Sequence, residues 1–246
     1  MAKAKVKRVF FTGAPGSMWS SPDRWHRCAM IPHTDYSDCT PERVWNQHQG
    51  AFWNPGNEPG YDWIFNFLDY SREEIEEKLD SAYLDPIPDA SEKEFIVRHH
   101  KSHYFSFYID HIVKLFPECD IVLTHQKPHM SFLWWQMCGG HDTVHDSYHY
   151  YKRDYGAIWN EIVNQTRAVE EAVARYSLDL EVFNMDWIEK YYGKPSILAQ
   201  RRVEEVLAHP DGFFGGLPPL MGNHSDGRNI ANSVRVAIKL GTPRQW

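Results

Sequence analysis

Residues 6–21 read VKRVFFTGAPGSMWSS, an apolar run that breaks into a turn of small residues. The run predicts a β-strand over residues 6–12, and the Gly, Pro and Ser residues behind it predict a tight loop leading into a helix. A loop of this kind presents backbone N–H groups to an anion, and the start of a helix adds partial positive charge. We interpret residues 13–21 as a phosphate-binding loop, although an ordinary strand-to-helix turn has the same pattern.

Strand and helix patterns alternate along the rest of the chain. Apolar runs predict strands at residues 94–98, 120–124 and 178–183. Helical patterns lie at residues 73–82, 103–116, from about 129, 155–176 and 195–208. This alternation predicts a three-layer α/β fold with a central parallel sheet of the P-loop NTPase-like type, built as one domain. Residues 20–61 show no clean period, and we expect an irregular insertion there.

Composition excludes several classes of protein. The 246 residues carry a formal net charge of −7, which argues against a generally basic nucleic-acid surface. No run approaches the ~20 apolar residues of a membrane span. The four cysteines form no C-x-x-C pair. We therefore expect a cytoplasmic protein without membrane or nucleic-acid partners. Aromatic residues reach 15% of the chain, which fits either heavy core packing or a pocket that encloses a ring or sugar.

The loop is not a standard nucleoside-triphosphate loop. The pattern G-x-x-x-x-G-K-[ST], counted from Gly13, places Met18 at the second glycine and Trp19 at the lysine. The spacing of Gly13 and Gly16 also fails the dinucleotide pattern G-x-G-x-x-G. ATP hydrolysis and kinase-type phosphotransfer are disfavoured, whereas a phosphate ligand without magnesium-triphosphate chemistry remains allowed.

Two further groups of polar residues follow predicted strands. Lys101, Ser102 and His103 come after the second strand, where a lysine can neutralise a leaving group and a histidine can take a proton from a hydroxyl. Residues 124–131, THQKPHMS, follow the third strand and offer a cation and a hydroxyl to a second phosphate. Each group alone could equally be a polar turn. Ligands of parallel α/β sheets bind beyond the carboxyl ends of the strands, which is where both groups fall.

The ordered set of motifs resembles the PAPS-dependent sulfotransferases. A strand with a P-x-S loop, a second strand ending in K-[ST]-H, and a third strand followed by a cation, a proline and a serine occur there in this order. Residues 182–186, VFNMD, and the Arg201-Arg202 pair resemble a later stretch of that family. The similarity touches roughly residues 6–21, 94–135 and 178–208.

The resemblance implies transfer of a sulfuryl group from PAPS (3′-phosphoadenosine 5′-phosphosulfate) to a hydroxyl or amine, without a required metal. It implies that His103 is the general base and that Lys101 stabilises the leaving oxygen. The implied cofactor-binding residues are Gly13, Ala14, Pro15, Gly16, Ser17, Met18, Trp19, Ser20, Lys127, Ser131 and Arg228. The chain departs from the family where Gly16 replaces the loop cation, where Gln126 replaces an arginine, and in the early position of Ser131.

Other interpretations stay open at this point. A non-catalytic nucleotide-binding or structural protein on the same fold fits the missing cations. His141, His145 and His149 are spaced by four and could hold a transition metal, or form a polar stripe beside the acceptor. The acceptor is expected to be a small molecule or glycan, such as a sugar, a phenol or a small alcohol. The oligomeric state is not indicated.

Overall fold

The computed structural model describes residues 5–30, 33–40, 50–54, 61–84, 94–137, 154–193 and 234–241. Five strands form one sheet in the order β2-β1-β3-β5-β4. They are β1 (Lys5–Gly13), β2 (Phe95–Lys101), β3 (Asp120–His125), β4 (Glu181–Val182) and β5 (Arg235–Lys239). β1 pairs in parallel with both β2 and β3, so the predicted parallel centre is confirmed.

The sheet is mixed rather than wholly parallel. β5 runs antiparallel to β3 and also to β4. The predicted parallel sheet is therefore confirmed for its centre and not for this edge. The sequence marks β5 as a short apolar patch, but an apolar patch carries no information about strand direction, which depends on the path of the preceding chain.

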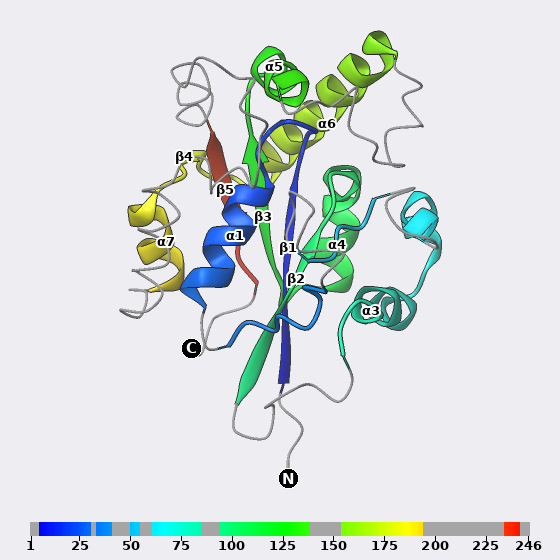
Figure 1. The fold of residues 1–246 in the computed structure, drawn as a ribbon, viewed down its shortest axis with the longest axis vertical. Helices are drawn as coiled ribbons and strands as arrows, with labels where there is room; N and C mark the ends of the chain where they lie inside the picture. The colour runs from blue at the N-terminus through cyan, green and yellow to red at the C-terminus, as the bar shows by residue number, and fades with distance from the viewer. Residues whose placement is uncertain are drawn as a thin grey trace.

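Helices cover both faces of the sheet (Figure 1). α1 (Ser20–Ala29) and α7 (Met185–Tyr192) pack on one face, against a core that includes Val9, Phe11 and Val122. The other face packs against η1 (Tyr61–Asp69), α3 (Arg72–Asp80), η3 (Tyr104–Tyr108), α4 (Ile109–Leu115) and α6 (Tyr155–Arg175). Phe10 and Leu123 point into this second core. Alternate residues of each strand thus enter opposite cores, and the described elements form three layers.

Several boundaries differ from the sequence prediction. The segment expected to be irregular contains α1, and η1 begins at its last residue. Residues 103–116 form two elements, η3 and α4, rather than one helix. β2 continues to Lys101, and β4 has only two residues. α5 (Pro128–Met137) and α6 begin where the sequence predicted. The helix predicted at residues 195–208 lies outside the described residues.

Local signals account for the helices that the sequence located well. The Ser71 hydroxyl accepts a hydrogen bond from the Glu74 backbone N–H, and the Glu74 carboxylate accepts one from the Ser71 N–H, forming a capping box before α3. Asp154 caps α6 in a similar way through the Gly156 and Ala157 N–H groups.

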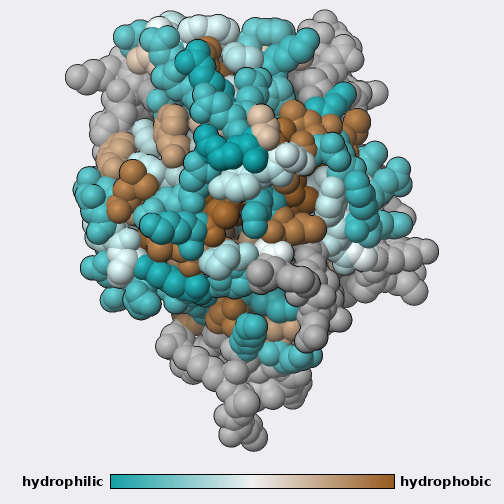
Figure 2. Space-filling model, turned by 180° about the vertical axis from the view of Figure 1, so that it is seen from behind, coloured by the Kyte–Doolittle hydropathy of each residue, from teal (hydrophilic) through white to brown (hydrophobic). Residues whose placement is uncertain are grey.

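In the described part of the chain, no helix is both long enough and apolar enough to cross a membrane. On the face opposite to that of Figure 1, apolar residues gather in small groups between hydrophilic ones (Figure 2).

Candidate functional site

The loop after β1 lies at the carboxyl end of the two central strands (Figure 1). β1 ends at Gly13, which is paired with Thr124 of β3. The Ser17 N–H donates to the Ala14 carbonyl at 2.9 Å, and both Gly16 and Met18 have positive φ, 77° and 64°. These left-handed conformations turn the chain sharply into α1, which begins at Ser20. The loop predicted from the sequence therefore exists as a tight turn before a helix.

Both loop glycines are required by close neighbours. A β-carbon at Gly13 would lie 2.5 Å from the Ser17 hydroxyl oxygen and 2.6 Å from the Thr124 carbonyl oxygen. A β-carbon at Gly16 would lie 2.0 Å from the Ser131 carbonyl oxygen on α5. The backbone of α5 thus occupies the space that any side chain at position 16 would need. A lysine at this position would collide with α5.

Three hydroxyl groups around this loop have no hydrogen-bond partner among the described residues. They are Ser17 Oγ, Thr124 Oγ1 and Ser131 Oγ, and all three residues are at most 1% exposed. A buried hydroxyl without a partner costs about 1–3 kcal/mol, so such groups are uncommon. Ser17 and Thr124 both border Gly13, and Ser131 borders Gly16. The loop therefore gathers unused donors from β3 and α5 near the start of α1.

The remaining residues predicted to bind the cofactor lie in different settings. Ala14, Pro15, Met18 and Trp19 are buried, whereas Gly16 and Ser20 are half-buried. Trp19 packs on Phe52, with ring centroids 4.9 Å apart. Lys127 is exposed in the turn before α5, where its carbonyl accepts from the Ser131 N–H at 3.1 Å. Arg228, Arg201, Arg202 and the three spaced histidines lie outside the described residues.

His103 follows the end of β2 and lies beside the end of β1. The Thr12 hydroxyl donates to the His103 carbonyl at 3.4 Å, one residue before the loop. The imidazole is 3% exposed, and its Nδ1 lies 2.9 Å from Nε2 of Gln165 on α6. Burial lowers the pKa of His103 to about 3, although the Gln165 hydrogen bond acts in the opposite direction. The ring is therefore uncharged at neutral pH.

Lys101 belongs to a buried ionic cluster beneath α1. Its Nζ lies 2.9 Å from Asp23 Oδ2, and Arg27 Nε lies 3.1 Å from Asp23 Oδ1. Arg27 also donates to both oxygens of Asp38, at 3.0 and 2.8 Å. All four side chains are at most 1% exposed, and their charges cancel. Burial lowers the pKa of Lys101, and Asp23 counteracts part of this effect. The ammonium thus faces α1.

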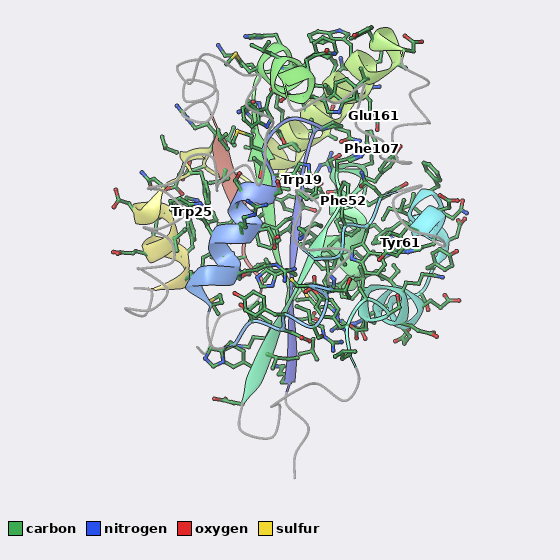
Figure 3. All side chains as sticks on the ribbon, viewed as in Figure 1. Trp19, Trp25, Phe52, Tyr61, Phe107 and Glu161 are labelled. Carbon is green, nitrogen blue, oxygen red and sulfur yellow. The ribbon has the colours of Figure 1, made fainter. Side chains whose placement is uncertain are left out.

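Aromatic side chains gather near the carboxyl ends of β1 and β2. Phe52 lies between Trp19 of the loop and His103, with centroid distances of 4.9 and 6.1 Å. Phe107, beyond His103 on η3, is 42% exposed. Figure 3 shows Trp19, Phe52, Phe107 and Glu161 at one end of the sheet. Phe52 thus lies beside both the loop and His103.

Known proteins offer no guide to the site. No model of a protein family, no curated protein and no solved structure matches the chain.

Sequence reasoning missed Thr124, Gln165 and Glu161. Gln165 lies on the face of α6 that Ile158, Ile162 and Val169 bury, and it is itself fully buried. A polar residue on the apolar stripe of the longest helix was a detectable signal, since such a residue needs a partner in the core. Thr124 lies in the segment 124–131 that the sequence indicated, but the sequence assigned it no role. Its place beside the loop follows from the pairing of Thr124 with Gly13 in the sheet.

Proposed function

We propose that the chain transfers a sulfuryl group from PAPS to a hydroxyl or amine acceptor, on a sulfotransferase-type P-loop-like fold. The observation that carries this proposal is the meeting of the loop with β3 and α5. Ser17, Thr124 and Ser131 offer buried hydroxyls that have no partner in the described part of the chain. Two helices, α1 and α5, begin there, and helix starts favour anions. The junction thus supplies neutral donors suited to two phosphates.

In this proposal the two ends of the nucleotide bind to two sides of the junction. The backbone N–H groups of Gly13, Ala14 and Gly16, with the Ser17 and Ser20 hydroxyls, hold the 5′-phosphosulfate. Pro15 has no N–H, and the Ser17 N–H already donates to the Ala14 carbonyl. Ser131 and Lys127 hold the 3′-phosphate. Gly16 contributes its backbone alone, because α5 leaves no space for a side chain. Charge-assisted hydrogen bonds of this kind contribute about 1.5–3 kcal/mol each.

His103 is the proposed base. The acceptor oxygen attacks the sulfur, and the bond between sulfur and the bridging oxygen of the 5′-phosphate breaks, so that its electron pair leaves with the phosphate. The hydroxyl proton passes to the imidazole. A ring with a pKa of about 3 is a weak base, but the attacking oxygen becomes strongly acidic as it bonds to sulfur. Proton transfer is therefore expected late in the reaction.

Lys101 acts indirectly in this arrangement. Its ammonium is held by Asp23, so contact with a leaving oxygen would require this buried ion pair to separate. We assign Lys101 the role of fixing α1, and with it the loop, relative to β2. The positive potential at the leaving group then comes from the loop amides and the start of α1.

Binding of adenosine 3′,5′-bisphosphate, the desulfated product of PAPS, tests the proposal. We expect calorimetric titration to show binding, and Ser131→Ala and Ser17→Ala to weaken it by about 10–100-fold. Ser81→Ala is the matched control, because Ser81 is an exposed residue at the end of α3. Absence of binding at millimolar nucleotide would overturn the proposal, and so would equal affinity in all three variants.

A non-catalytic nucleotide-binding protein is the second candidate, and the engagement of Lys101 by Asp23 favours it. The two candidates differ in turnover. The enzyme transfers labelled sulfate from PAPS to a mixture of sugars, phenols and alcohols, and His103→Ala removes this transfer while bisphosphate binding persists. The non-catalytic protein binds the nucleotide but labels no acceptor.

A further inference from the structure

A chain of hydrogen bonds connects His103 to a carboxylate on α6. Gln165 Nε2 lies 2.9 Å from His103 Nδ1 and 2.5 Å from Glu161 Oε1. Gln165 is fully buried, and its Oε1 has no hydrogen-bond partner among the described residues. The NH2 group has two hydrogens and serves two acceptors, so this orientation of the amide uses both.

This orientation determines where the neutral imidazole carries its proton. Nδ1 accepts a hydrogen bond from Gln165 and therefore has no proton of its own. The single ring proton is then on Nε2. A ring in this tautomer presents an N–H donor at Nε2 and cannot accept a proton there.

A half-turn of the Gln165 amide produces the opposite tautomer. The carbonyl oxygen then accepts from an N–H at Nδ1, which leaves a lone pair at Nε2 for the acceptor proton. The same half-turn points the carbonyl at Glu161. The ionised carboxylate of Glu161 would repel the Gln165 carbonyl oxygen, whereas the protonated carboxyl group donates a hydrogen bond to it. Burial raises the pKa of Glu161, against the opposing Gln165 hydrogen bond, so the protonated form is within reach.

We propose that Gln165 is a positioning residue whose amide orientation decides which nitrogen of His103 can act as the base, and that Glu161 sets this orientation. The inference rests on the proposed function in assigning His103 a proton-accepting role. The control of the His103 tautomer by Gln165 rests on the hydrogen bonds alone. The acceptor hydroxyl favours the working orientation, because it donates to a free lone pair at Nε2.

Among the residues that the structure describes, Glu161 is the ionisable group that bonds to the Gln165 amide and titrates in the acidic range. Tyr108 of η3 faces it, and burial together with the Glu161 charge raises the pKa of this phenol, which stays protonated in the acidic range. His125 of β3 is paired with Glu170, farther along α6. Burial lowers the pKa of His103 to about 3, so this ring is neutral while Glu161 titrates.

Nitrogen-15 NMR of the His103 ring tests the inference without any substrate. In the wild type we expect the Nε2–H tautomer at neutral pH, and a growing Nδ1–H fraction as the pH falls through the titration of Glu161. Glu161→Gln can donate or accept and should make the tautomer independent of pH. Gln165→Leu should do the same, whereas Glu170→Gln, a change on an exposed part of α6, should behave as the wild type.

Kinetics provide the second readout. We expect Gln165→Leu to lower the transfer rate by about 10–100-fold at every pH with unchanged bisphosphate binding. In the wild type, we expect the transfer rate to fall as the pH rises and Glu161 ionises. In Glu161→Gln, we expect this fall to be absent. A wild-type tautomer that ignores pH, or a pH change that persists in Gln165→Leu, overturns the inference. Absence of sulfuryl transfer with the NMR signals as expected overturns the proposed function alone.

Discussion

Gly16 lies in the loop after β1, and α5 leaves no space for a side chain at this position. The Ser131 carbonyl oxygen lies 2.0 Å from the place of a β-carbon, and φ at Gly16 is positive. A loop that packs against a helix backbone has a fixed shape but no space for a charged side chain at the point of contact. Anion binding then depends on amides and hydroxyls, which is why Ser17 and Ser131 carry the proposal.

Replacing Gly16 by alanine measures this packing. We expect Gly16→Ala to lower the free energy of unfolding by about 2 kcal/mol or more beyond the cost of the positive φ. Gly193→Ala is the matched control, because Gly193 has φ of 78° and nothing within 4 Å of a β-carbon. Urea denaturation of both variants gives the comparison. Equal losses would mean that α5 does not restrict the loop.

At the scale of elements, α1 is held to β2 by buried charges as well as by the apolar side chain of Trp25. The inner side of α1 presents Asp23, His26 and Arg27, all at most 1% exposed. These polar residues hide the helical period, which is why the sequence suggested an irregular segment there. By contrast, the apolar runs of β1 and β3 were readable, since central strands are buried on both faces.

Lys101→Met tests the ionic attachment of α1. The change leaves the cluster with an uncompensated buried negative charge, and we expect it to lower the free energy of unfolding by about 3–5 kcal/mol. Lys190→Met removes one side of an exposed pair with Glu181 and should leave the free energy of unfolding nearly unchanged. Chemical denaturation compares the two. A Lys101→Met variant as stable as Lys190→Met would contradict the attachment.

The spacing of residues in the sequence did not predict the directions of the side chains in the candidate site. Lys101 and His103 are two residues apart, and the sequence placed both in one site, yet Lys101 faces Asp23 while His103 faces Gln165. The partners that separate them lie on α1 and α6, far along the chain. Local patterns located the strand ends, whereas the direction of each side chain depends on contacts that only the folded sheet creates.

At the scale of the whole molecule, buried histidines link stability to pH. Burial lowers the pKa values of His99 and His100 well below the usual range and that of His103 to about 3. The unfolded chain binds these protons near pH 6.5, so acid favours unfolding. The contribution is fully present above pH 6.5 and is lost as the pH falls toward the folded-state values.

His103→Gln isolates one of these contributions. Between pH 6.5 and pH 5 the wild type should lose about 2 kcal/mol of unfolding free energy more than the variant, because one extra proton binds the unfolded chain. Urea denaturation at the two pH values measures the difference. The control is His125→Gln, since His125 is half-buried and paired with Glu170 at the surface. Identical pH slopes for wild type and His103→Gln would contradict a neutral, buried imidazole.

A crystal structure with adenosine 3′,5′-bisphosphate tests the central proposal most directly. We expect the 5′-phosphate at the N–H groups of Gly13, Ala14 and Gly16 and the 3′-phosphate at the Ser131 hydroxyl, with His103 facing the space where the sulfuryl group would lie. Crystals grown at saturating nucleotide whose loop and Ser131 hydroxyl contact no phosphate would contradict it.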